Sequence, residues 1–136
     1  MLRNVLYLAV GAVVLAGCVV SVHNTGECAT EGNQDRVLRH VVLFKFKDGT
    51  SSQEIREIEN AFRALPGKVD AICDFEWGTD VSVENLQQGF THCFLVTFRS
   101  EADRAEYLPH PAHKEFGEML GPYLDKVLVV DYWTKR

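Results

Sequence analysis

The sequence lacks three features that mark common classes of protein. It has no surplus of basic residues: 14 Lys and Arg stand against 19 Asp and Glu, a net charge of -5. Because neutralisation of phosphates by Lys and Arg drives most nucleic-acid binding, we expect no DNA or RNA partner. No two cysteines have C-x-x-C spacing, so neither a structural zinc site nor a thioredoxin-like centre is supported.

The third missing feature is an apolar run of the roughly 20 residues that a comfortable membrane span needs. The N-terminal run from Val5 to Leu15 follows one basic residue, Arg3, and ends in Leu15-Ala16-Gly17-Cys18. This order is typical of an export signal. We expect residues 1–17 to be a signal peptide, and the alternative is an uncleaved short anchor.

The last four residues of this segment, Leu-Ala-Gly-Cys, resemble the lipobox of bacterial lipoproteins, in which the cysteine, here Cys18, is lipidated. The resemblance implies a membrane anchor through lipid alone, with the domain in the periplasm or outside the cell. Val19 in place of Asp favours the outer membrane if the cell has one. Residues 18–36 would then be the lipidated cysteine and a flexible tether, because residues 19–35 are mainly polar and have no apolar period.

Residues 37–136 have the size and composition of one folded domain. Alternating side chains predict four strands, over residues 37–47, 71–79, 90–98 and 126–133. The link between the second and third strands is too short for a crossover helix, so we expect these two strands to pair antiparallel.

Helices are predicted between the strands. The residues from Ser51 to Glu54 have the spacing of a capping box, and apolar residues then recur every three or four positions until Pro66-Gly67. Ser100 can cap a second helix over residues 101–107. A third runs from Pro111 to about residue 120, with core spacing for Phe116, Met119 and Leu120.

This order of elements, β, α, β, β, broken α, β, predicts the α+β ferredoxin-like sandwich, in which helices cover one face of the sheet. We expect the first and third strands to be parallel neighbours at its centre. The other face carries Val41, Leu43, Cys93 and Leu95, and no further element can cover it. Because an exposed apolar face usually marks an interface, we expect a homodimer in which two sheets form a barrel.

Two of the cysteines, Cys73 and Cys93, fall on the predicted hairpin strands. A disulfide between them is conceivable in an exported protein. The alternative is that both are small buried apolar residues.

Two histidines open the central strands: His40 begins the first and His92 the third. If these strands are parallel, both imidazoles meet at one end of the helix-covered face. The alternative is a pair of core histidines bonded to backbone carbonyls.

The run from Tyr107 to His113 adds groups that could transfer protons. Pro111 suits the first position of a helix, His110 its cap and His113 its first turn, where the helix dipole disfavours an imidazolium. A neutral His113 could accept a proton near pH 7, with the Tyr107 phenol at the same mouth. The alternative is that these residues only shape the helix junction.

Five segments together resemble the stress-responsive dimeric α/β-barrel (Dabb) family: residues 39–47, 74–78, 89–92, 107–113 and 130–132. The resemblance implies the dimeric barrel independently of the pattern above. Most members have no assigned activity. One plant member is an aldol cyclase of a polyketide thioester, and similarity to it implies working roles for His40, His92, Tyr107 and His113.

Two functions follow. In the first, the tethered barrel binds a small, partly apolar molecule without turnover, and the candidate ligand-binding residues are Phe44, Phe94, Trp77 and His110. In the second, the chain is a cyclase, isomerase or lyase that uses no cofactor.

In that enzyme, His113 removes a C–H proton while Tyr107, aided by His40 or His92, hydrogen-bonds the developing enolate. A zinc triad of His40, His92 and His113 is a third alternative, but the spacing shows no metal motif, so no metal is expected.

Overall fold

The computed structural model describes residues 36–135, so the predicted signal peptide and Cys18 lie outside the described residues. Eight elements follow in order: β1 (Leu38–Phe46), α1 (Ser52–Arg63), the short 3-10 helix η1 (Leu65–Gly67), β2 (Asp74–Thr79), β3 (His92–Phe98), α2 (Glu101–Tyr107), α3 (Pro111–Leu120) and β4 (Leu124–Trp133). None of the helices in this part of the chain has the length and apolarity to cross a membrane.

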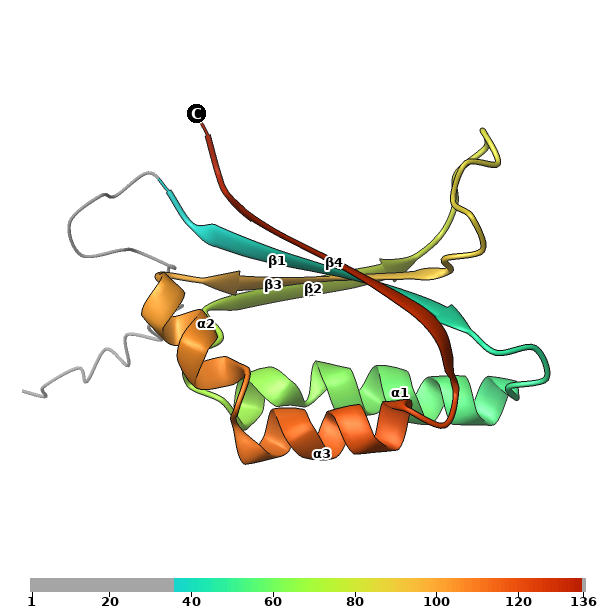
Figure 1. Ribbon diagram of the computed structural model, residues 1–136, viewed down its shortest axis with the longest axis horizontal. Coiled ribbons are helices and arrows are strands. Elements are labelled where there is room, and N and C mark those ends of the chain that lie inside the picture. Colours follow the sequence, from blue (N-terminus) through green and yellow to red (C-terminus); the bar gives the residue numbers. More distant parts are fainter. Residues whose placement is uncertain (1–35, 136) are drawn as a thin grey trace, which may run out of the picture.

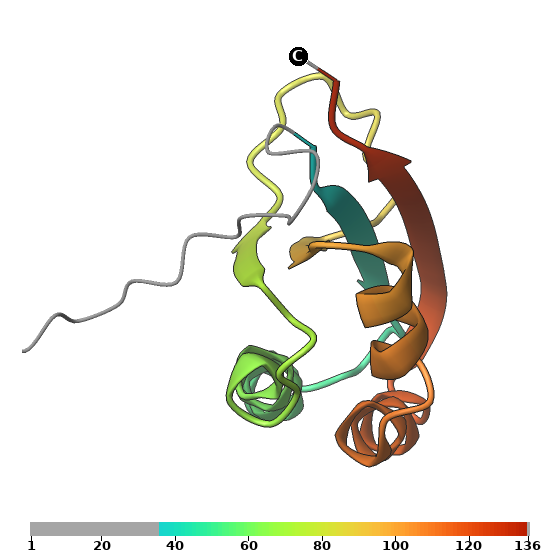
Figure 2. The same cartoon turned by 90° about the vertical axis from the view of Figure 1, so that its left-hand side faces the viewer.

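The four strands form one sheet in the order β2-β3-β1-β4, and every neighbouring pair is antiparallel. Helices α1 and α3 lie side by side under one face, as Figures 1 and 2 show. This is the predicted ferredoxin-like α+β sandwich. The prediction that β1 and β3 are parallel is wrong: β2 runs parallel to β1 across β3, and the β2–β3 hairpin turns β3 back.

Local sequence explains where the helices begin. The Ser51 hydroxyl accepts a hydrogen bond from the Glu54 backbone N–H, and the Glu54 carboxylate accepts one from the Ser51 backbone N–H, so the predicted capping box is confirmed. These hydrogen bonds hold the pKa of Glu54 below its usual range. Ser100 caps α2, and His110 caps α3 with Pro111 as its first residue, also as predicted.

The core lies between the sheet and the helices. Four phenylalanines form its centre, with ring centroids 4.3 Å apart for Phe62 and Phe94, 4.6 Å for Phe62 and Phe116, and 5.1 Å for Phe44 and Phe94. Leu120 is buried with them, but Met119 is exposed, which corrects its predicted core position. Met119 falls on the outer side of α3.

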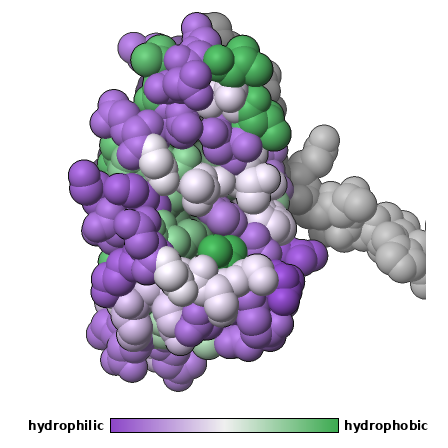
Figure 3. All heavy atoms as spheres, turned by 90° about the vertical axis from the view of Figure 1, so that its right-hand side faces the viewer, coloured by the Kyte–Doolittle hydropathy of each residue, from purple (hydrophilic) through white to green (hydrophobic). Residues whose placement is uncertain are grey.

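The second face of the sheet has no cover among residues 36–135 (Figure 1). Pairing places Val130 beside Val41 and Leu128 beside Leu43, so this open face has an apolar centre. Leu128 and Val130 are 40% and 47% exposed. The loop between β2 and β3 adds exposed Val81, Val83 and Leu86, and Figure 3, which faces this end of the molecule, shows apolar surface near its top.

Neither prediction for the cysteines holds. Cys93 is a free, exposed thiol on the open face, whereas Cys73 is disulfide-bonded and half-buried just before β2. The two therefore do not bridge, and they are not a pair of buried apolar residues. Burial of part of Cys93 and the nearby Glu76 carboxylate raise the pKa of the Cys93 thiol.

Candidate active site

The first component of the site is a histidine on β1 that is hydrogen-bonded to a carboxylate. His40 is 6% exposed, and its Nδ1 lies 2.6 Å from Oδ1 of Asp131 on β4, the residue that faces it in the sheet. The other carboxylate oxygen of Asp131 accepts a hydrogen bond of 2.8 Å from Arg104 on α2. Because a carboxylate can only accept, Nδ1 of His40 donates this hydrogen bond, which leaves Nε2 as the nitrogen able to exchange a proton with a substrate.

The second component is the phenol of Tyr107 at the end of α2. The side chain is 1% exposed, and its ring centroid lies 5.9 Å from that of His40. Burial raises the pKa of Tyr107 well above its ordinary value, because the charged phenolate is poorly solvated there. Tyr107 is therefore a neutral O–H donor at any physiological pH.

The third component is His113 in the first turn of α3. Its ring also packs against the phenol of Tyr107, with ring centroids 4.3 Å apart. Its Nδ1 lies 3.0 Å from the backbone carbonyl oxygen of Leu108. A carbonyl can only accept, so Nδ1 is the protonated nitrogen and Nε2 is the basic one. The turn that Pro109 and Pro111 impose places this carbonyl opposite the ring.

These three residues line one cavity of about 430 Å³ under the sheet. Its other walls are mainly apolar, from β1, α1, β4, the end of α2 and the inner side of α3. They are Val42, Phe44, Phe62, Leu108, Phe116, Gly117, Leu120, Gly121, Leu124, Val127, Val129 and Asp131. The polar groups sit together at the His40 side of a space that otherwise suits an apolar molecule.

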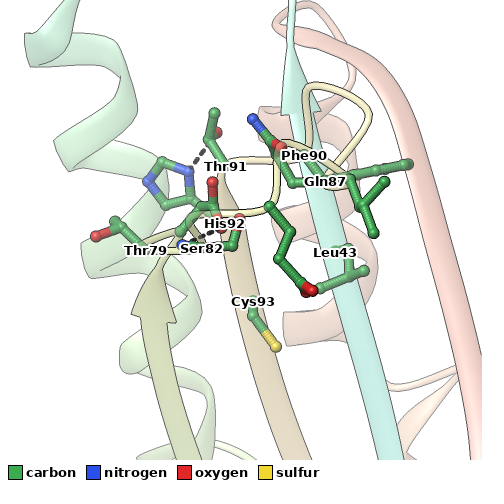
Figure 4. Close-up of a pocket in the computed structure, with 11 residues that line it drawn as sticks. Leu43, Thr79, Ser82, Gln87, Phe90, Thr91, His92 and Cys93 are labelled. Carbon is green, nitrogen blue, oxygen red and sulfur yellow. Dashed lines mark hydrogen bonds between the residues drawn. The ribbon is translucent and has the colours of Figure 1, made fainter.

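His92 does not belong to this group, which corrects the predicted meeting of His40 and His92. The antiparallel register pairs His92 with Phe44, four residues along β1 from His40, a separation of about 13 Å. Its Nε2 lies 3.0 Å from Glu59 on α1, and its Nδ1 lies 2.8 Å from the Thr91 hydroxyl. Figure 4 shows the ring turned toward that helix, beside a separate cavity under the β2–β3 loop.

Of the four predicted ligand-binding residues, one lines the cavity of His40 and three lie outside it. Phe44 lines the cavity of His40, whereas Phe94, Trp77 and His110 do not. Phe94 is fully buried behind Phe44, and Trp77 stacks on Phe94 at 5.8 Å. His110 serves as the cap of α3, where its Nδ1 accepts the Ala112 amide.

The zinc-triad alternative finds no support in the geometry, because His92 lies apart from His40 and His113. Across residues 36–135, no group of three His, Cys, Asp or Glu side chains is placed to hold a metal ion.

Sequence reasoning missed Asp131 and Arg104 as members of the site. Asp131 gave a signal that could have been used: it is a charged residue at an inward position of β4, in line with Val127 and Val129. Such a residue needs a partner, because an unpaired charge is costly to bury. Arg104 gave no comparable signal, since one arginine on a short polar helix is ordinary.

A ferredoxin-like sheet with one open face and a histidine- and tyrosine-lined cavity under the other defines the class of this protein. The chain belongs to the Dabb family, the stress responsive A/B barrel domain, which it matches over residues 38–134. It is 47% identical over 95 residues to stress-response A/B barrel domain-containing protein HS1 of Arabidopsis thaliana, which covers 70% of this chain and 87% of that protein. It is 32% identical over 99 residues to olivetolic acid cyclase of Cannabis sativa, covering 73% and 98%.

Solved structures show the same fold. Hydroxynitrile lyase from Passiflora edulis superposes with a TM-score of 0.69 at 30% identity, over 73% of this chain and 94% of that one. A dimeric protein of unknown function with a ferredoxin-like fold from Bacteroides fragilis superposes with a TM-score of 0.58 at 27% identity, over 71% and 94%.

Proposed function

We propose that this protein is an enzyme that moves a proton at or next to the carbonyl group of a small, partly apolar compound, with its own side chains as acid and base. One observation carries the proposal: the Tyr107 phenol packs against two imidazoles, each with its Nδ1 proton held by an acceptor, and all three residues line an apolar cavity. A phenol kept neutral beside two basic nitrogens suits acid–base catalysis.

The proposed step uses His113 and Tyr107. Nε2 of His113 takes the proton from the carbon next to the carbonyl, and the electron pair of that C–H bond moves toward the carbonyl oxygen to form an enolate. The Tyr107 hydroxyl donates a hydrogen bond to that oxygen as its negative charge develops. General-base help of this kind contributes about 10²- to 10⁴-fold in rate.

From the sequence we expected His40 to help hydrogen-bond the enolate. Its hydrogen bond to Asp131 supports a different role. Its Nδ1 proton is directed at Asp131, so Nε2 accepts rather than donates. His40 is suited to take a proton from a substrate hydroxyl, because the Asp131 carboxylate stabilises the imidazolium that forms. A cyclase, an isomerase and a lyase all fit these roles.

The relatives support this class of reaction. Two proteins at 32% and 30% identity carry the names olivetolic acid cyclase and hydroxynitrile lyase.

The second candidate function is binding of a small apolar molecule without turnover, which the apolar walls of the same cavity favour. Fold alone does not separate the two.

Hydrogen–deuterium exchange separates them. The protein is incubated in D₂O with acetophenone and with 2-hexanone, and loss of the protons next to each carbonyl is followed by NMR. We expect exchange above the buffer rate, and a loss of about 100-fold or more in His113→Ala. Lys114→Ala, the exposed neighbour on α3, is the control and should keep the wild-type rate. Binding of either ketone with no exchange would leave the binding function and reject the enzyme.

We further propose that the protein is a homodimer with the two open faces packed together. The apolar centre of that face and the dimeric relative from Bacteroides fragilis support this arrangement.

Lipid attachment at Cys18 is a proposal from sequence alone, with the domain held at the cell envelope. It predicts that Cys18→Ser moves the protein from the membrane fraction to the soluble fraction of the expressing cell. An unchanged membrane fraction would reject the lipid anchor.

A further inference from the structure

The cavity has a glycine on the inner side of α3 that nothing in the fold requires. Cavity-lining residues of this helix are His113, Phe116, Gly117, Leu120 and Gly121, the three- and four-residue spacing of one helical face. Gly117 lies in the interior of the helix, where glycine is less favourable than alanine. A stabilising residue is therefore absent at a position that faces the site.

Packing does not explain the glycine. A Cβ atom built on Gly117 meets no other atom within 4 Å, so the fold leaves open space there. Its backbone lies outside the left-handed region that favours glycine. Gly121 is different, because its Cβ would approach the Gly117 carbonyl at 3.4 Å. Alanine at position 117 would thus fit the protein without strain.

The position of Gly117 relative to His113 gives the explanation. Residues four apart on a helix are neighbours, with Cβ atoms about 6 Å from each other. A side chain at position 117 would therefore stand beside the His113 ring. Gly117 is exposed, so this side chain would occupy the open side of the space that both residues line. When the carbon that loses its proton approaches Nε2 of His113, the group attached to the neighbouring carbonyl carbon lies near position 117.

We infer that Gly117 is the specificity-determining residue of the cavity, and that its missing side chain makes room for a bulky group, a ring or a branched chain, attached directly at the reacting carbonyl. This inference rests on the proposed function. Its substrate class is a carbonyl compound with such a group, in preference to one with a slender alkyl chain.

The test compares Gly117→Ala and Gly117→Leu with wild type. Gly117→Ala should raise Tm by about 2–6 °C, because alanine is the better helix former and fits the space. In the exchange assay, Gly117→Leu should lower the rate with acetophenone, whose ring is attached to the carbonyl, at least about tenfold. The rate with 2-hexanone should stay within about threefold of wild type. Glu118→Ala and Glu118→Leu, at the exposed neighbouring position, should leave both rates unchanged.

Each other outcome has a defined meaning. A lower Tm in Gly117→Ala, or an equal loss for both ketones in Gly117→Leu, would overturn the inference. If wild type exchanges neither ketone, the proposed enzyme function fails. NMR titration of the protein with each ketone then tests whether Gly117 still determines which ligand binds. Selective loss of acetophenone binding in Gly117→Leu would support the role of Gly117. Unchanged binding, or no binding of either ketone to wild type, would overturn it.

Discussion

At the scale of single residues, the site depends on the way each polar group is held. Tyr107 is buried on a short helix, and its environment favours the neutral phenol. His113 and His40 each have one nitrogen committed to an acceptor, a carbonyl in one case and a carboxylate in the other. These contacts fix the orientation of both rings and leave Nε2 of each as the basic nitrogen.

The raised pKa of Tyr107 predicts a stability change in alkaline solution. A tyrosine in the unfolded chain has a pKa of about 10, and burial raises the value in the folded protein. As pH rises above 10, the unfolded chain loses this proton while the folded protein keeps it, so the free energy of unfolding falls. Urea unfolding at pH 8 to 11 should show this fall in wild type and a smaller one in Tyr107→Phe.

The matched control removes another phenol, away from the cavity and the open face. Tyr123 is half-buried just before β4, so Tyr123→Phe should retain most of the wild-type dependence on pH. An equal change in both variants would contradict the account of Tyr107.

At the scale of elements, two polar bridges connect the sheet to the helices at different places. Asp131 on β4 joins His40 on β1 and Arg104 on α2. His92 on β3 joins Glu59 on α1, and its ring also lies 5.1 Å from that of Phe46 at nearly a right angle. The first bridge lies in the cavity, and the second fastens α1 to the sheet outside it.

This difference predicts opposite results for stability and activity at His92. His92→Leu leaves the mostly buried Glu59 carboxylate without its partner, so the free energy of unfolding should fall by about 1–3 kcal/mol. The exchange rate below the melting temperature should stay within about threefold of wild type. Glu59→Gln keeps a polar group opposite His92, so the free energy of unfolding should fall less than in His92→Leu. Stability equal to wild type in His92→Leu would contradict the structural role of this contact.

The sequence predicted the elements well because their signals are local. Ser51 and Glu54 lie within one helical turn, and strand alternation was read correctly along β1, β3 and β4. The second strand begins at Asp74 rather than at residue 71, because residues 71–73 continue the apolar pattern before pairing starts.

The arrangement of the site was predicted only in part, because it depends on strand direction. Tyr107 and His113 lie on consecutive helices, so the chain itself brings them together. Whether His92 joins them depends on the direction of β3 relative to β1, which no single segment shows. The hairpin predicted for β2 and β3 implied the observed direction, and combining it with the β1-α1-β2 crossover would have separated His40 from His92.

At the scale of the whole molecule, the sheet has two apolar faces, but the helices cover only one of them. Helices α1 and α3 cover the face that carries His40 (Figure 2). The open face combines Val41, Leu43 and Leu95 with the alternate, outward side chains of β4, which are Leu128, Val130 and Tyr132. A second copy of the chain, packed through the same face, would bury the open faces of both protomers. We therefore expect the dimer to be required for stability.

Replacement of Leu95 tests this interface. Leu95 lies at the centre of the open face on β3, beside Val41. Leu95→Lys places a charge in each half of the two-fold contact, so we expect a monomer at micromolar concentration by light scattering. Met119→Lys, at an exposed residue on the outer side of α3, should leave the dimer intact. A dimeric Leu95→Lys protein would contradict the proposed interface.

The most direct test of the central claim compares His113, which lines the cavity, with His92, which contacts Glu59 outside it. The measurement is the acetophenone exchange rate in D₂O for His113→Leu and His92→Leu, each below its own melting temperature. The account predicts a loss of about 100-fold or more for His113→Leu and a nearly unchanged rate for His92→Leu. Equal losses in the two variants, or a wild-type rate in His113→Leu, would contradict it.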